Sequence, residues 1–426
     1  MTDHLGAGLA LAVLLLLAAL VGLRTGTDGR PVLPLAEARR RRHDLLPVGE
    51  AVHARHRAFH RTLRPWTYVS LVVGVAVPVL FGLTPLGATV VDAVGVGPAP
   101  LRAALGGLAL GALAELVTLP LAVRRERVLR RYGLSVRTWR SWIADAAKSA
   151  VLGAVLSGAA LAALYAVLGA QPHWWWAWAA PGAALLVVLL SFVFPVLVEP
   201  LFLRFTPMAD SPLRQRLLAL AERGGVPVRD VLVADASRRT TALNAYVSGF
   251  GATRRVVVFD TLLRDAPAGE VEVVVAHELG HAARRDVLSG TALSALGLAA
   301  LVCGAHLVLT SPALLRAAGA DAPADPRSVG LLFAMSALAG LALRPLQNLL
   351  SRRIETRADS FALNLGRRPA VFATMQRRLA LTNLADLDPG MLDHLLFASH
   401  PTTVQRIAAA EAFGAGAPLD DGTTSG

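Results

Sequence analysis

Seven long apolar segments, almost free of charged residues, constrain the fold of this chain more than any other feature. Each is close to the roughly 20 residues that an α-helix needs to span a bilayer. The composition agrees, because 54% of the residues are hydrophobic and only 17% are charged, whereas soluble domains have about 45–50% and about 25%. We therefore expect a mainly α-helical, polytopic membrane protein with seven transmembrane helices, at residues 5–23, 68–91, 103–123, 149–169, 174–198, 287–309 and 328–350.

The first apolar segment is either a cleaved signal peptide or a membrane anchor. A signal peptide carries positive charge before its apolar region. Here residues 1–4 contain no lysine or arginine, and Arg24 follows the apolar segment. We therefore expect an uncleaved anchor with the N-terminus outside the cell.

The charges between the apolar segments predict the orientation of the chain. Residues 24–64 and 124–148 are rich in arginine, whereas residues 92–100 and 171–173 contain no lysine or arginine. Short cytoplasmic connections carry the excess of positive charge in membrane proteins. We therefore expect a multi-pass protein of the cell membrane, with the long connection 202–286 and the C-terminus in the cytoplasm.

The net charge of +12 has the same topological origin. A nucleic-acid-binding surface would combine basic residues with stacking aromatic residues on a soluble face, whereas these arginines cluster beside apolar segments. We expect no nucleic-acid partner. The single cysteine, Cys303, excludes an intrachain disulfide and a thiolate metal cluster.

The segment between the fifth and sixth apolar segments has the character of a soluble α+β domain. Residues 211–224 have the pattern of an amphipathic helix, and the short runs 231–234, 242–247 and 254–259 predict a small β-element with a hairpin. A helix is expected from about Gly269 onward. We divide the chain into an N-terminal membrane region with five spans, a catalytic domain that includes spans six and seven, and a disordered tail, at residues 1–203, 204–414 and 415–426.

The pentapeptide His277-Glu278-Leu279-Gly280-His281 supplies candidates for a metal site. Residues four apart share one face of a helix, so both imidazoles can bind one metal ion. Glu278, one position along, can hold a metal-bound water and accept its proton. This is the H-E-x-x-H arrangement of zinc peptidases.

A zinc ion bound by two histidines needs a third protein ligand, and residues 351–362 offer one. Glu355 and Asp359 lie four apart, so they share a helix face. Glu355 can bind the metal, while Asp359 can hydrogen-bond a ligating imidazole. The alternative is a solvent-facing charged stripe, because arginines interleave with these acids. Asp286 either braces a ligating histidine in the same way or is an interfacial charge.

These motifs together resemble the M48 metallopeptidases and, more narrowly, the type I CAAX prenyl endopeptidases. In that family an H-E-x-x-H motif precedes one span and an E-x-x-x-D motif follows another. The resemblance covers about residues 60–412, with the same number of spans. Three further stretches are similar to the family: residues 131–135 with Trp142 and Asp145, Asn244-Ala245-Tyr246, and His400-Pro401 followed by Arg406.

The resemblance implies a zincin-like catalytic domain on the cytoplasmic side and seven helices that enclose a chamber. It also implies the following roles: one Zn²⁺ per chain bound by His277, His281 and Glu355, Asp359 behind a ligand, Glu278 as general base, His400 and Arg406 beside the scissile carbonyl, and Asn244 and Tyr246 on the substrate. We expect a monomer in the lipid bilayer. Its substrates would be peptides or proteins, including lipid-modified or membrane-associated ones.

Two alternatives stay open. An HtpX-like membrane quality-control protease would share the motifs but have fewer spans. A transporter or receptor with a structural zinc ion would have four protein ligands and no general base, and Glu278 argues against it.

Other polar and aromatic residues are assigned to the membrane and its surface. His53, His56 and His60 are spaced as on one helix face, and we expect this face to lie in water rather than to bind a second metal. Glu115 and His306 fall within spans and are expected to face an interior of the protein. The tryptophans at 174–176 and Trp178 predict a belt at the membrane interface.

Overall fold

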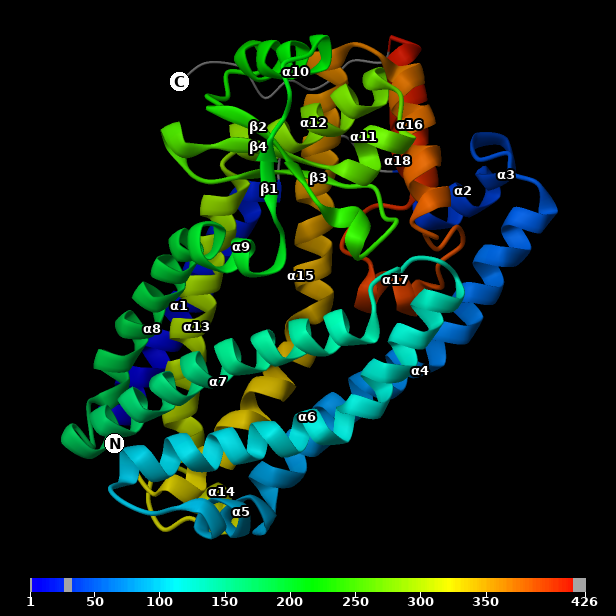
Figure 1. The fold of residues 1–426 in the computed structure, drawn as a ribbon. Coiled ribbons are helices and arrows are strands. Elements are labelled where there is room, and N and C mark those ends of the chain that lie inside the picture. The colour runs from blue at the N-terminus through cyan, green and yellow to red at the C-terminus, as the bar shows by residue number, and fades with distance from the viewer. Residues whose placement is uncertain (1, 27–32, 417–426) are drawn as a thin grey trace.

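The computed structural model describes residues 2–26 and 33–416 of the chain (Figure 1). Most of these residues are helical, and seven helical segments of this part are long and apolar enough to cross a membrane, which confirms the predicted class. The spanning helices are α1 (Thr2–Gly26), α4 (Glu50–Leu83), α6 (Ala99–Arg131), α7 (Trp139–Ala170), α8 (Trp175–Val193), α13 (Asp286–Leu309) and α15 (Val329–Gly366).

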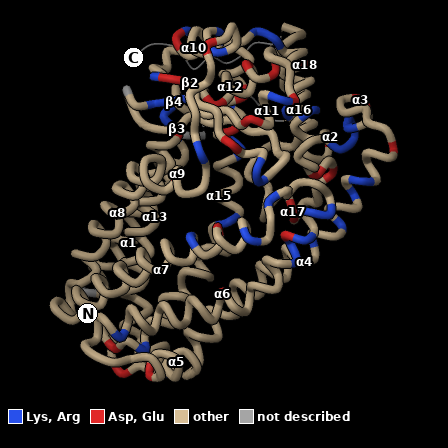
Figure 2. The backbone as a smooth tube through the Cα atoms, viewed as in Figure 1, with Lys and Arg blue, Asp and Glu red and all other residues tan. Residues whose placement is uncertain are grey.

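In Figure 1, α1, α8 and α13 lie together on one side of α15 and α4 lies on the other, while α6 and α7 run across the view between the two sides. Helices α1 and α8 pack on α13, whereas α4 packs on α15 and α6, and α7 packs on α6. The short helices α5 (Leu86–Val94) and α14 (Pro312–Ala318) lie at the end far from the sheet. Charged residues gather at the sheet end and around α4 and α17 (Met391–Phe397), while α1, α8 and α13 carry few (Figure 2).

Two predicted spans differ from the observed helices at their ends. The second apolar segment, 68–91, is broken because Thr84 has an extended backbone and Pro85 follows it, so α4 ends at Leu83 and α5 starts at Leu86. The last segment, 328–350, continues without a break through Glu355 and Asp359 to the end of α15. One helix therefore joins the membrane to the predicted metal site.

The soluble domain is built on a four-stranded sheet of order β1-β2-β4-β3. Strands β3 and β4 form the predicted antiparallel hairpin, and β2 pairs with β4 in parallel. Gly249 begins the hairpin turn with a φ of 88°, and a Cβ there would lie 2.7 Å from the carbonyl oxygen of Thr253, so this turn requires glycine. The strands are β1 (Phe205–Pro207), β2 (Asp230–Ala234), β3 (Ala245–Ser248) and β4 (Arg255–Phe259).

Helices surround this sheet and complete the domain. A short π-helix (Phe194–Val198) and α9 (Glu199–Phe202) lead from α8 into β1. The apolar core of the domain includes Leu217, Val256, Leu279, Phe372 and Ile407. The N-terminal region contributes to the same core from its own short helices. The helices are α2 (Leu35–Arg40), α3 (Arg42–Leu45), α10 (Pro212–Arg223), α11 (Asp260–Asp265), α12 (Ala268–Ala283), α16 (Pro369–Thr382), α17 (Met391–Phe397) and α18 (Thr403–Gly414).

The structure corrects the prediction for the three histidines of α4. His53 and His56 are buried, with 4% and 3% of their surface exposed, and His60 is partly buried. His56 and His60 contact backbone carbonyls of the segment between α16 and α17, and the ring of His53 lies 5.9 Å from that of His43 in α3. The sequence pattern located one helix face correctly, but it did not show that protein covers that face.

The four tryptophans of the predicted interface belt differ in burial. Trp175 and Trp176 are buried, whereas Trp174 and Trp178 are exposed. The ring of His306 is buried against both buried tryptophan rings, with centroids 5.8 and 6.1 Å away, so the expectation that His306 faces the interior is confirmed. Glu115 is exposed on α6, and its position toward an interior stays a prediction. Residues 417–426 of the predicted disordered tail lie outside the described residues.

Candidate active site

Three predicted metal ligands converge at the contact between α12 and α15. His277 Nε2 lies 3.2 Å from His281 Nε2 and 3.2 Å from Glu355 Oε2. His281 Nε2 lies 3.6 Å from Glu355 Oε1. Ligands at about 2.05 Å from a tetrahedral zinc ion are about 3.3 Å apart. The residues therefore fit a zinc ion with three protein ligands. Among the described residues they are the group of His, Cys, Asp and Glu side chains that could hold a metal ion.

Close packing of the two helices brings these ligands together. Gly280 lies where a Cβ would approach the Ala358 Cα and the Phe361 Cβ to 3.1 Å each. The glycine of the H-E-L-G-H motif thus lets α12 lie directly against α15. His277 and Glu355 are both buried at this contact.

A carboxylate holds each candidate imidazole from behind. His277 Nδ1 lies 2.9 Å from Asp359 Oδ1, and His281 Nδ1 lies 2.9 Å from Asp286 Oδ2. Each Nδ1 is therefore the donor to a carboxylate, which leaves Nε2 to face the shared point between the ligands. Asp286, which the sequence left open, occupies the same position relative to His281 as Asp359 does to His277.

Each of these carboxylates is in turn bound by an arginine, buried in the case of Arg357 and partly buried in the case of Arg406. The Arg406 guanidinium donates two hydrogen bonds to Asp359, one of them from Nε at 2.8 Å. Arg357 Nη2 donates to Asp286 Oδ1 at 2.6 Å. Burial lowers the pKa of His277, but the hydrogen bonds that its ring donates to Asp359 and Glu355 outweigh burial and raise the pKa to about 10. The acids around the site therefore favour positive charge at this point.

Glu278 lies between two cavities beside the candidate ligands. One cavity, of about 360 Å³, is lined by Asn244, His277, Glu278, His400 and Arg406, among others. We call it the active-site cavity. The other, of about 200 Å³, is lined by Glu278 and His281 together with the hairpin turn at 249–250. Burial raises the pKa of Glu278, which the two histidines partly offset, and this brings the carboxylate nearer to the range of a proton acceptor at neutral pH.

The predicted residues of the C-terminal motif reach the site in different ways. His400 follows α17, and its Nε2 lies 3.3 Å from Glu355 Oε1 with 56% of its side chain exposed. Arg406 comes from α18, where Thr402 and Gln405 cap the helix start. It lines the active-site cavity while its guanidinium is bound to Asp359.

The structure separates the two predicted substrate-binding residues. Asn244 immediately precedes β3 and lines the active-site cavity. Tyr246 packs with Phe205 and Phe259 in a cluster around Leu232 and Val257 on the sheet, with its ring 6.3 Å from that of Phe259. The structure therefore brings Asn244, but not Tyr246, to the candidate site.

Among the residues that sequence reasoning missed in the wall of the active-site cavity, Asn383 makes a specific contact with the substrate-binding candidate segment. Asn383, at the end of α16, hydrogen-bonds the backbone of Leu243 just before Asn244. No motif surrounds Asn383, so its sequence neighbours gave no signal for this contact.

Comparisons with known proteins place this architecture among characterised families. Residues 207–413 match the model of peptidase family M48, and residues 54–204 match that of the CAAX prenyl protease N-terminal region with five membrane helices. The chain is 30% identical over 305 residues to an uncharacterized metalloprotease, YhfN, of Bacillus subtilis, with 71% of each chain covered. It is 32% identical over 316 residues to a CAAX prenyl protease 1 homolog of Arabidopsis thaliana, with 69% of this chain and 70% of that protein covered.

A solved structure shares the whole fold. The crystal structure of S. mikatae Ste24p superposes with a TM-score of 0.77 at 21% sequence identity, covering 95% of this chain and 98% of that one. The five-helix N-terminal match favours the CAAX-protease branch over an HtpX-like protein with fewer spans. The chain thus belongs to peptidase family M48, on the branch of the CAAX prenyl proteases, and is a membrane metalloendopeptidase.

Proposed function

We propose that this protein is a zinc-dependent endopeptidase that hydrolyses extended peptides at the cytoplasmic boundary of the membrane. The observation that carries the proposal is the convergence of His277 Nε2, His281 Nε2 and a Glu355 oxygen with tetrahedral spacing, beside the Glu278 carboxylate. A bound zinc ion would supply a Lewis acid for water and for the substrate carbonyl.

Glu278 is the proposed general base. Its carboxylate takes a proton from the attacking water and delivers it to the leaving amine, so that one residue serves both halves of the reaction. Asp359 and Asp286 keep His277 and His281 in the tautomer whose Nε2 is free to bind metal. This chemistry needs three protein ligands and an open position, which distinguishes it from a closed structural site.

His400 and Arg406 have different proposed parts in stabilising the negative charge that forms on the carbonyl oxygen. The His400 imidazole is exposed in the cavity beside Glu355, where it can donate a hydrogen bond to that oxygen. Arg406 keeps Asp359 in place through its two hydrogen bonds. Its positive charge on the cavity wall adds to the field at the same point.

The edge strand β3 is the proposed substrate-binding element. It ends the sheet order β1-β2-β4-β3, so one of its sides has no strand partner in the described sheet. An extended peptide can pair with such an edge through backbone hydrogen bonds. Residues just before and after the strand line the two cavities on either side of Glu278, so a peptide along β3 would pass the base. Asn244 then holds the substrate backbone, with Tyr246 as a support on the sheet.

The proposed setting is a monomer in the cell membrane with its N-terminus outside and its active site in the cytoplasm. The alternation of basic and uncharged connections supports this orientation. Peptides and proteins, including lipid-modified or membrane-associated ones, are the substrate class. The relatives named CAAX prenyl protease support that class.

The Glu278→Gln variant tests the proposal. Glutamine keeps the shape of the side chain but cannot accept the proton, so hydrolysis of a peptide should fall by about 10² to 10⁴. Zinc content, measured by elemental analysis of the same sample, should stay at one per chain. Normal hydrolysis by a zinc-loaded Glu278→Gln protein would falsify the assigned role.

A further inference from the structure

The backbone that leads into β3 is held by a side chain from a distant helix end. The Leu243 N–H donates to Asn383 Oδ1 at 3.0 Å, and Asn383 Nδ2 donates to the Leu243 carbonyl at 3.3 Å. One amide thus satisfies both backbone groups of Leu243, as a neighbouring strand would. The next residue is Asn244, whose carbonyl accepts from the Phe259 N–H at 3.0 Å. Asn383 therefore sets where the edge strand begins.

Residues 383–386, which we call the bridging segment, are held in turn by α4. His60 Nε2 lies 2.8 Å from the Leu384 carbonyl oxygen, and His56 Nδ1 lies 2.9 Å from that of Ala385. Arg64 Nη2 donates to Asp386 at 2.7 Å. These three residues of α4 are spaced by four, so they form one row along the helix, which we call the α4 row.

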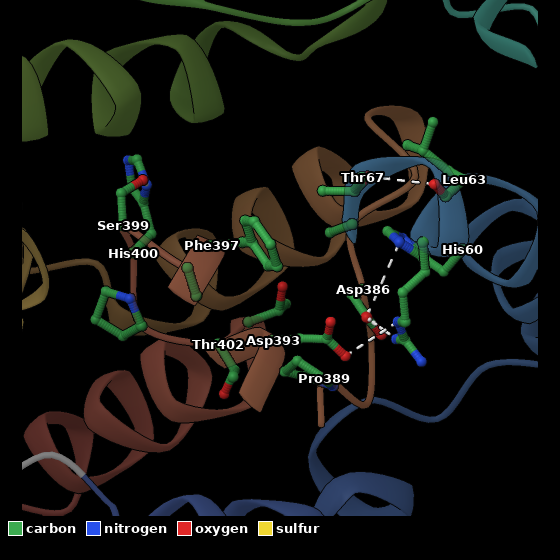
Figure 3. A pocket seen from close by; sticks show the side chains of 15 residues that line it. His60, Leu63, Thr67, Asp386, Pro389, Asp393, Phe397, Ser399, His400 and Thr402 are labelled. Carbon is green, nitrogen blue, oxygen red and sulfur yellow. Dashed lines mark hydrogen bonds and ion pairs between the residues drawn. The ribbon is translucent and has the colours of Figure 1, made fainter. Parts of the chain in front are cut away.

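The α4 row continues beside a cavity of about 350 Å³ that adjoins the active-site cavity. His400 and Ala385 line both cavities. Figure 3 shows His60 and Asp386 on one side of this space and His400 at the other. The bridging segment is therefore the common wall of the active site and of the contact with α4.

The conformation of Leu384 shows that this contact determines the shape of the segment. Leu384 has a φ of 48°, in the left-handed region, which costs about 1 kcal/mol or more for a residue other than glycine. Its side chain is buried with Phe59 of α4 and Val128 of α6. Burial between two membrane helices thus holds the bridging segment in a backbone conformation that a free loop would leave.

From these contacts we infer that Asn383 is a positioning residue for the substrate-binding strand β3, and that the α4 row holds Asn383 in place. The inference rests on the proposed role of β3. Beyond that role, we infer that the membrane-spanning helix α4 sets the position of the edge strand β3 relative to Glu278, and that it acts through the bridging segment. Substrate binding should then depend on residues of α4, which lie outside the candidate metal ligands and outside β3.

The decisive measurement separates KM from kcat. Zinc-loaded, full-length protein in nanodiscs is assayed with an internally quenched, unstructured peptide, selected from a random mixture as one that the wild type cleaves. Asn383→Ala should raise KM by about tenfold, because two hydrogen bonds that place the binding edge are lost, with a smaller change in kcat. A purely structural role would reduce the number of active molecules, which lowers apparent kcat and leaves KM unchanged.

Two further variants grade the effect and provide a matched control. Asn383→Asp keeps the acceptor for the Leu243 N–H but loses the donor, so its KM should lie between those of the wild type and Asn383→Ala. Asn348 also donates to a backbone carbonyl, that of Leu395, at 3.0 Å, but it lies away from β3. Asn348→Ala should keep the wild-type KM, so an equal rise in both alanine variants would overturn the inference.

The α4 row has its own pair of variants. Arg64→Gln removes the ion pairs with Asp386 and Asp393 and should raise KM in the same direction, by a few-fold. Arg61→Gln removes the same charge from an exposed position three residues earlier and should leave KM as it is. If Asn383→Ala does not fold, Asn383→Asp and this pair decide the question by the same criterion.

The outcome is distinguishable from failure of the proposed function. If the wild type cleaves no peptide, or Glu278→Gln cleaves normally, the proposed function is wrong. If the wild type cleaves and all Asn383 and Arg64 variants bind zinc and keep the wild-type KM, only the positioning role is wrong.

Discussion

Replacing Asp286 by asparagine should weaken zinc binding and destabilise the fold through two separable effects. The carboxylate bridges His281 Nδ1 at 2.9 Å and Arg357 Nη2 at 2.6 Å. Asparagine retains the shape and one acceptor oxygen but removes the negative charge. His281 then loses the partner that orients its ring, and Arg357, which is 5% exposed, loses its counter-charge.

The two effects have different magnitudes. Loss of a carboxylate behind a ligating histidine typically lowers metal affinity by about 10- to 100-fold, or about 1.4–2.7 kcal/mol. A buried cation left without its partner typically costs about 3–5 kcal/mol of folding stability. We therefore expect the stability change to exceed the zinc-affinity change in Asp286→Asn.

A second variant resolves the two effects experimentally. The double variant Asp286→Asn with Arg357→Met removes the unpaired charge, so it should recover most of the lost stability without recovering zinc affinity. Thermal unfolding in nanodiscs reports stability, and competition with a zinc chelator reports affinity. Wild-type zinc affinity in the single variant would refute support of His281 by Asp286. Recovery of zinc affinity in the double variant would show that the loss arose from general packing.

Three other predictions concern the metal ligands, the topology and the substrate. Glu355→Ala should abolish stoichiometric zinc binding, whereas Asp359→Ala should weaken zinc binding by about 10- to 100-fold. Normal zinc content in Glu355→Ala would show that another residue is the third ligand. Reporters fused after Asp265 and after residues 42, 131 and 415 should report a cytoplasmic location, whereas reporters fused after residues 95, 172 and 320 should report a location outside the cell. An outside location for the fusion after Asp265 would contradict a cytoplasmic active site. A cleavable sequence should be cut in a flexible tail and resist cleavage within a stably folded domain, because strand pairing needs an extended substrate; equal rates for both would indicate an open site.

The sequence predicted the parts of this molecule whose signals are local. Helical spacing within residues 277–281 gave the two histidines, and spacing of four gave Glu355 with Asp359. Hydropathy gave the seven spans, because a membrane helix needs a long uncharged run. The hairpin of β3 and β4 also followed from Val-rich runs with a glycine between them.

The parts that sequence missed depend on which surfaces meet. The spacing of His53, His56 and His60 defines one helix face, but only the fold shows that protein covers this face, with the bridging segment against His56 and His60. Strand β1 has three residues and ends in Pro207, so it has neither the length nor the alternation that predicts a strand. Asn383 binds a backbone 140 residues away, and no pattern in its own neighbourhood could indicate that partner.

The placement of the candidate ligands on α12 and α15 has a consequence for the amount of protein in a cell. His281 lies just before the sixth span, and Glu355 lies in α15 just beyond the apolar segment 328–350. A bound metal ion would therefore cross-link chain segments separated by two membrane crossings. A ligand that binds only the folded state stabilises it, by about 4 kcal/mol at a thousandfold excess over its Kd. Chains that fail to acquire metal would then be inactive and also easier to unfold, and proteolysis removes unfolded molecules first. Zinc supply should therefore govern how many copies of the enzyme persist, and not only how many of them are active.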